Sequence, residues 1–145
     1  MLFRSGIAWS PDETTMYYVD TTEGGIDTFD YDAETGMISR RRRFVTIERG
    51  SGAPDGLVVD TEGCIWVALW DGWAVRRYSP DGAHLGTVDV PAGRVTKPAF
   101  GGPDLGDLYI TTAAADRPDD AQPHAGGVFL ARPGARGVAA HAYAG

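Results

Sequence analysis

The sequence predicts an all-β protein, a β-propeller of three four-stranded blades, and three observations lead to this prediction. Glycine and proline together make up 29 of the 145 residues, so turn signals are frequent. No stretch of about 12 or more residues carries an apolar period of 3.6, which argues against a helical bundle. The same succession of four short strands recurs three times, at a spacing of about 40 to 50 residues that is typical of a propeller blade.

Each of the three units consists of four apolar strands separated by turns. The expected blades are residues 6–47, 54–91 and 98–143. The expected strands are 6–9, 16–20, 25–29 and 37–47, then 55–60, 64–68, 73–78 and 84–90, then 98–101, 108–112, 127–131 and 138–143. The turns carry proline, aspartate or glycine, as at 10–12, 62–63, 80–82 and 103–104.

Aromatic residues occupy equivalent places in the second strand of each unit. These residues are Tyr18, Trp66 and Tyr109, and their numbers differ by 48 and 43. We interpret them, with the isoleucines and valines around them, as core between neighbouring blades. Because an arc of three blades leaves an apolar face uncovered at each end, the sequence predicts truncation, self-association of two arcs, or poor solubility.

Charge and cysteine content exclude several classes of partner. The net charge of -7 repels a phosphate backbone and an anionic membrane surface, so we expect no nucleic acid and no membrane partner. The run from Arg40 to Arg43 is interpreted as an exposed outer strand. Cys64 is the single cysteine, and no apolar run is long enough for a signal peptide or a membrane span, so a cytoplasmic protein is expected.

Seven short blocks occur in an order that resembles the C-terminal half of the gluconolactonase, regucalcin or senescence marker protein family. The blocks are Gly-Ile-Ala-Trp-Ser-Pro-Asp (6–12), Tyr-Tyr-Val-Asp (17–20), Phe-Asp-Tyr-Asp (29–32), Ala-Pro-Asp-Gly-Leu (53–57), Cys-Ile-Trp-Val-Ala (64–68), Ala-Phe-Gly-Gly-Pro-Asp-Leu (99–105) and Ala-Gly-Gly-Val-Phe (125–129). The resemblance implies a six-bladed ring of about twice this length, of which this chain would be half.

The resemblance also implies a chemistry. Members of this family hydrolyse sugar lactones with one divalent metal ion, calcium, zinc, magnesium or manganese, held on the axis by Glu, Asn and the Asp of the Pro-Asp-Gly block. That Asp is Asp55 here, which the resemblance makes a metal ligand and general base. Without the resemblance, Asp55 reads as a turn residue before Gly56.

The chain departs from the family pattern at its beginning. Ser5 stands where the family has its ligand Asn, so Ser5 is the second candidate metal ligand. Residues 2–5, Leu-Phe-Arg-Ser, match one reading frame of a common sequencing adapter. We therefore expect residues 1–5 to be a non-native leader, which the codons CTC TTC CGA TCT would reveal.

Two readings of function remain open. In the first, the chain is a truncated lactonase that has one of three family ligands and shows no lactonase activity alone, with His124 near the substrate at the end of a long insertion in the third unit. In the second, it is a non-catalytic propeller that serves as a binding scaffold. An axial carboxylate at Asp55 favours the enzyme, since a scaffold needs no acidic group facing the channel.

Overall fold

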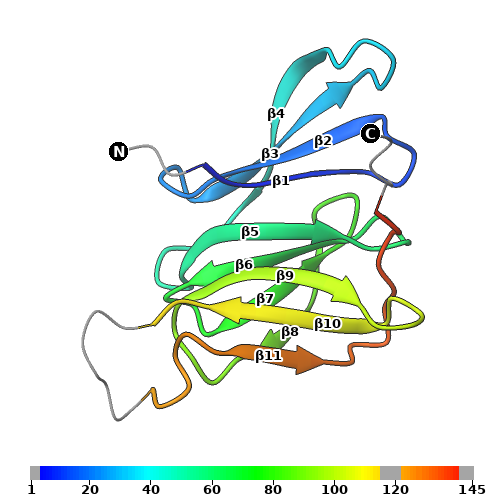
Figure 1. Ribbon diagram of the computed structural model, residues 1–145. Coiled ribbons are helices and arrows are strands. Elements are labelled where there is room, and N and C mark those ends of the chain that lie inside the picture. Colours follow the sequence, from blue (N-terminus) through cyan, green and yellow to red (C-terminus); the bar gives the residue numbers. More distant parts are fainter. Residues whose placement is uncertain (1–3, 115–121, 141–145) are drawn as a thin grey trace.

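Three antiparallel sheets make up the protein in the computed structural model, which describes residues 4–114 and 122–140 (Figure 1). The first sheet contains β1 (Arg4–Trp9), β2 (Thr15–Asp20), β3 (Gly25–Tyr31) and β4 (Ile38–Thr46). The second contains β5 (Ala53–Val59), β6 (Ile65–Trp70), β7 (Ala74–Tyr78) and β8 (His84–Asp89), and the third β9 (Val95–Gly101), β10 (Asp107–Thr112) and β11 (Val128–Ala131). In the residues so described, no helix is long and apolar enough to cross a membrane.

Within each sheet the strands are paired in chain order. The first strands of the three sheets, β1, β5 and β9, lie against one another in a row, with the rest of each sheet extending outward (Figure 1). This arrangement of meander sheets around inner strands is that of propeller blades, and it confirms the predicted all-β propeller fold.

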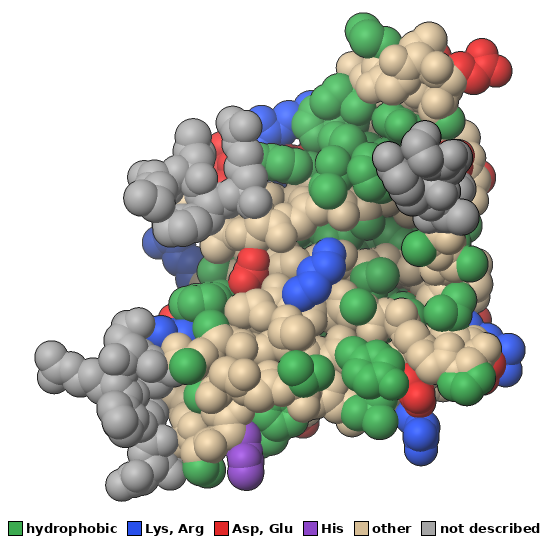
Figure 2. Space-filling model, in the orientation of Figure 1, with side chains coloured by type: hydrophobic (Ala, Val, Ile, Leu, Met, Phe, Trp, Pro, Cys, Tyr) green, Lys and Arg blue, Asp and Glu red, His purple; other side chains and the backbone are tan. Residues whose placement is uncertain are grey.

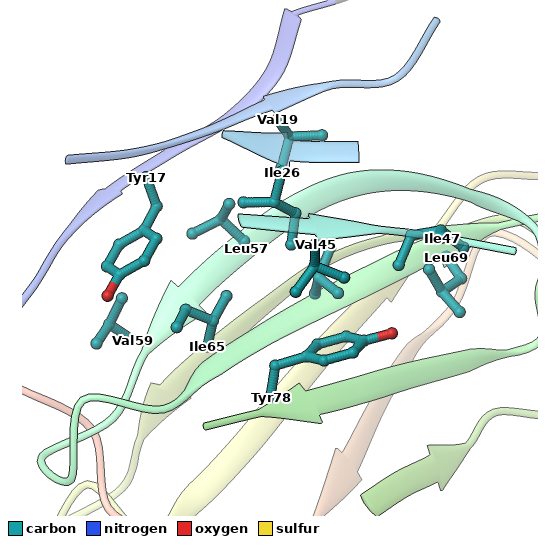
Figure 3. Close-up of a cluster of buried hydrophobic side chains, with 11 residues drawn as sticks. Tyr17, Val19, Ile26, Val45, Ile47, Leu57, Val59, Ile65, Leu69 and Tyr78 are labelled. Carbon is teal, nitrogen blue, oxygen red and sulfur yellow. The ribbon is translucent and has the colours of Figure 1, made fainter. Parts of the chain in front are cut away.

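The second sheet is covered on both faces, and this packing holds the three sheets together. Along β6, Ile65, Val67 and Leu69 point toward the first sheet, whereas Trp66 and Ala68 point toward the third, as the alternation of a strand requires. The first of these two cores is drawn in Figure 3, where side chains of the first two sheets meet. Each large aliphatic side chain buried there contributes about 1.5–3 kcal/mol.

The arginine run lies on the outermost strand of the first sheet, as predicted. Arg40 to Arg43 belong to β4 and are exposed. Arg41 and Arg43 both pair with Asp27, at 2.5 and 2.8 Å. These two guanidinium groups thus form ion pairs within their own sheet.

The third sheet differs from the expected four strands. Residues 138–140 form no strand, and residues 141–143 lie outside the described residues. Pro133 and Gly134, whose φ is 81°, follow β11 and lead the chain away from the sheet edge. Gly137 instead forms an isolated bridge with Asp60, so this segment returns to the second sheet. The described part of the third sheet therefore has three strands.

Candidate functional site

A β-bulge interrupts each of the three inner strands at an equivalent position near its start. In β1 the extra residue is Ser5. In β5 Asp55 and Gly56 together occupy the place of one residue. In β9 the extra residue is Thr96. Because a bulge re-aims side chains and disturbs the alternation of a strand, these residues leave the pattern that fills the core on either side.

Two glycines at the bulges of β1 and β5 allow the inner strands to approach one another closely. A Cβ on Gly6 would lie 3.0 Å from the carbonyl oxygen of Asp55, and a Cβ on Gly56 would lie 2.6 Å from the carbonyl oxygen of Thr96. Only glycine fits this spacing at position 56. The third inner strand has Lys97 at this place.

Ser5 and Asp55 come from neighbouring sheets and meet at the bulges. The Thr21 hydroxyl donates a hydrogen bond to the Ser5 hydroxyl oxygen at 2.8 Å. The Ser5 hydroxyl and the Gly56 N–H lie near the Asp55 carboxylate. The carboxylate is half-buried, and this burial raises the pKa of Asp55, although Ser5, Lys97 and the Gly56 N–H act in the opposite direction. The two residues that the sequence proposed as metal ligands are therefore neighbours across the first two sheets.

Lys97 is a site residue that the sequence reasoning missed. Its stem lies over Gly56, and its ammonium group donates a hydrogen bond to the Leu57 carbonyl oxygen at 2.6 Å. Burial of this ammonium end lowers the pKa of Lys97, while Asp55 acts to raise it. The signal was the alignment of the repeats, in which Lys97 replaces the glycine of the other two inner strands.

The site opens to solvent through a pocket of about 370 Å³ beside the first bulge. Its lining includes Ser5, Tyr18 and Lys97. Figure 2 shows this face, where one acidic and one basic side chain lie close together near its middle. The Ser5 hydroxyl and the charged Lys97 thus border a cavity that a small molecule can enter.

His124 lies apart from this contact network. It is exposed on the connection between β10 and β11, which leaves the third sheet at the end where β9 begins. The cavity beside it has a volume of about 410 Å³ and is lined by residues 123–129. His124 therefore faces the same end of the sheets as Asp55, and its role in substrate binding stays a prediction.

A second acidic cluster contains metal-binding residue types but serves the fold. Potential ligand atoms of Asp60, Glu62 and Cys64 lie within 4.8 Å of one another. Asp60 is fully buried and accepts hydrogen bonds from the backbone N–H of Cys64 at 2.9 Å and from Trp66 Nε1 at 2.9 Å. Arg77 completes this set at 2.7 Å from Asp60 and 2.5 Å from Glu62. The two carboxylates thus form hydrogen bonds and ion pairs with residues of their own sheet.

Comparison with protein families gives one match over most of the chain. Residues 1–114 match the family described as the SMP-30/gluconolactonase/LRE-like region. Regucalcin of Oryctolagus cuniculus is 40% identical over 97% of this chain and 49% of its own length. A pentonolactonase of Haloferax volcanii is 45% identical over 77% of this chain and 38% of its own length.

Solved structures agree in fold. A luciferin-regenerating enzyme superposes with a TM-score of 0.84 and 37% identity, over 94% of this chain and 47% of that one. A calcium-binding regucalcin from Agrobacterium tumefaciens gives a TM-score of 0.83 and 39% identity, over 88% and 45%. A gluconolactonase from Xanthomonas campestris gives 0.65 and 32%, over 74% and 34%. The chain thus spans between 34% and 49% of the length of these relatives.

Proposed function

Because the chain belongs to the SMP-30/gluconolactonase/regucalcin family, we propose that it forms half of the active site of a divalent-metal-dependent sugar lactone hydrolase. The observation that carries this proposal is the half-buried Asp55 carboxylate beside Ser5, at two bulges on adjacent inner strands. Lactones are the substrates named for the Haloferax and Xanthomonas relatives.

The oxygen donors present suit a hard divalent cation as part of a larger ligand set. A carboxylate at Asp55 and a hydroxyl at Ser5 are oxygen ligands of the kind that calcium and magnesium prefer. The two side chains are neighbours at the bulges of β1 and β5, so one ion could contact both. When bound, such an ion polarises a lactone carbonyl and acidifies a water molecule. Two oxygen ligands are too few to retain calcium, which takes six to eight.

Asp55 is also the proposed general base. Its half-buried carboxylate has a raised pKa, and that shift makes it a better proton acceptor than an exposed aspartate. The Ser5 hydroxyl and the Gly56 N–H lie beside this carboxylate and favour its charged form. In this role Asp55 accepts the proton of the attacking water.

Lys97 is proposed to bind the oxygens of the lactone or of the opened acid. An ammonium group has three N–H donors, and one of them is used by the Leu57 carbonyl oxygen. Lys97 lines this pocket together with Ser5, so the remaining donors are proposed to serve the ligand. His124, at the same end of the sheets, is kept as a more distant substrate contact.

A chimera tests this function. The N-terminal half of the Oryctolagus cuniculus regucalcin is joined to this chain, and Ser5 is changed to Asn. We expect the chimera to hydrolyse a five- or six-membered sugar lactone, to lose activity with a chelator, and to regain it with a divalent cation. The chain alone is expected to be inactive, because it supplies one carboxylate and one hydroxyl.

Substitutions in the chimera assign the role of Asp55. Asp55→Asn keeps a ligand oxygen but removes the base, so kcat should fall by roughly two orders of magnitude. Asp89→Asn, on the exposed outermost strand of the same sheet, is the matched control and should leave kcat unchanged. Full activity of Asp55→Asn contradicts the base. A chimera that binds no metal and opens no lactone favours the alternative, a non-catalytic binding scaffold.

A further inference from the structure

Lys97 is the only lysine among the 13 lysine and arginine residues of the chain. The arginines form ion pairs with carboxylates of the outer strands and turns, as Arg77 does with Asp60 at 2.7 Å. Lys97 lies on the inner strand β9 instead, and its ammonium group donates to a neutral acceptor, the Leu57 carbonyl oxygen, at 2.6 Å. The one lysine is thus used differently from the arginines.

The position of Lys97 places a positive charge over the neighbouring inner strand. Asp55 and Lys97 are the charged side chains that the structure describes on β1, β5 and β9. The Lys97 stem crosses the bulge of β5, where its Cδ lies 2.4 Å from the place of a Cβ on Gly56. Its ammonium group then reaches Leu57, two residues beyond Asp55. Two residues of a strand span about 6–7 Å, so the charge lies about that far along β5 from the proposed base.

The pocket beside the first bulge gives a small molecule access to Lys97. Its described lining is Ser5, Gly6, Ile7, Tyr18 and Lys97, and of these five residues only Lys97 is charged. Lys97 also lines a neighbouring groove of about 630 Å³. The hydroxyl groups of Ser5 and Tyr18 suit the hydroxyl groups of a sugar, since each can donate and accept a hydrogen bond. The described lining therefore combines one positive charge with two hydroxyls.

An ammonium group at this place matches an anion better than a neutral sugar oxygen. It has three donors and no acceptor, so its best partner is a group that only accepts, such as a carboxylate. A hydrogen bond between two charged groups is about twice as strong as one between neutral groups. The net charge of -7 repels anions from the chain as a whole. Attraction of an anionic ligand to this pocket must therefore come from Lys97 itself.

We propose that Lys97 makes this site selective for sugar lactones that carry a carboxylate, the class derived from sugar diacids. In such a lactone the free carboxylate lies at the opposite end of the carbon chain from the lactone carbonyl. With the carbonyl beside Asp55, the carboxylate extends along β5 to the ammonium group over Leu57. Lys97 then holds the remote end of the substrate and orients the reacting end. The inference rests on the proposed function, because it names the substrate class of that site.

The single lysine permits a binding test on the chain itself. When the chain is made with isotope-labelled lysine, the NMR signal of the labelled side chain belongs to Lys97 alone. In chelator, the γ-lactone of glucaric acid should shift this signal to saturation. The γ-lactone of gluconic acid, which has a hydroxymethyl group in place of the carboxylate, should leave it unshifted at the same concentration. Acetate is the control for charge without a sugar ring and should shift the signal far less than the glucaric lactone.

Kinetics of the chimera test selectivity with the same two lactones. Lys97→Met keeps the stem but removes the charge, so kcat/KM for the glucaric lactone should fall by roughly 10-fold to 100-fold, the scale of one hydrogen bond between charged groups. The value for the gluconic lactone should stay unchanged. Lys97→Arg keeps the charge and should retain a preference for the glucaric lactone. Arg132→Met removes a positive charge from a side chain that is 75% exposed after β11, and this matched control should change neither value.

The outcomes separate this inference from the proposed function. A chimera that opens both lactones, with both values of kcat/KM lowered alike or not at all in Lys97→Met, overturns the selectivity and leaves the lactonase in place. A chimera that opens neither lactone contradicts the lactonase, and the NMR titration still decides what Lys97 binds. Equal shifts with the two lactones, or with acetate and the glucaric lactone, overturn the assignment to carboxylated sugar lactones. Lys97→Gln replaces Lys97→Met if the latter unfolds.

Discussion

Asp55 and Asp60 lie at opposite ends of β5 and show how differently one strand can use two aspartates. Asp60 is fully buried, and the backbone of its own turn, Trp66 and Arg77 satisfy its carboxylate. Asp55 is half-buried at a bulge and is held by Ser5 from another sheet. Burial is greater at Asp60, whereas Asp55 lies beside Ser5 and Lys97, which both line a pocket.

The difference separates a structural carboxylate from a candidate catalytic one. A buried charge whose hydrogen-bonding capacity is filled by one sheet stabilises that sheet and has little capacity left for a ligand. A carboxylate with a raised pKa, few partners and access to solvent can accept a proton or an ion. The three predictions that follow test this contrast from the largest expected effect to the smallest.

Removing the Asp60 carboxylate should have the largest effect on stability. In Asp60→Ala, Arg77 loses its buried partner and two donors of the turn are left unpaired, so the free energy of unfolding should fall by about 3–5 kcal/mol. Urea unfolding followed by fluorescence measures this change. Asp89→Ala, an exposed control, should stay within about 0.5 kcal/mol of the parent. If Asp60→Ala and Asp89→Ala lost the same free energy of unfolding, Asp60 would not be the structural carboxylate that distinguishes it from Asp55.

Filling the bulge of β5 should have an intermediate effect. A Cβ on Gly56 meets the Thr96 carbonyl oxygen at 2.6 Å and the Lys97 stem at 2.4 Å, so Gly56→Ala must push β5 and β9 apart. The free energy of unfolding is expected to fall by about 1–3 kcal/mol. Gly86→Ala is the control, because a Cβ there has open space and should be tolerated. A Gly56→Ala chain as stable as Gly86→Ala would contradict the close approach of the inner strands.

The pH dependence should show the smallest effect and isolates Asp55. Burial raises the pKa of Asp55 above its ordinary value of 3.8. The folded chain therefore binds more protons than the unfolded chain between 3.8 and the raised pKa. This carboxyl makes the free energy of unfolding fall as pH rises through that window and adds no further change above it.

Asp55→Asn is the variant that exposes this contribution. Other aspartates, such as Asp12 and Asp30, have pKa values lowered by hydrogen bonds from Ser10 and Arg42, and they make stability rise with pH. The difference between parent and Asp55→Asn, measured by urea unfolding in chelator between pH 3 and 7, cancels those contributions. A difference that grows with pH in favour of the parent would contradict the raised pKa.

The sequence by itself determined the class of fold and the repeat. Turn residues and alternating apolar strands act over a few neighbours, so the three units and the exposed arginine strand could be predicted without a structure. Asp55 and Ser5 were identified through resemblance to a family, because Asp55 alone reads as a turn residue. Asp60 has the same local appearance, and no local pattern separates the two.

Only the tertiary structure decided what surrounds each of these residues. The bulge at Asp55, its contact with Ser5 fifty positions earlier and the reach of Lys97 to Leu57 all join different strands or sheets. The departure of the chain after β11 toward Asp60 is decided in the same way, by a bridge between the C-terminal segment and the second sheet. The physical reason is that desolvation and partner geometry depend on segments that are distant in the chain. Local sequence therefore fixes the strands, and packing between sheets fixes which carboxylate is available for chemistry.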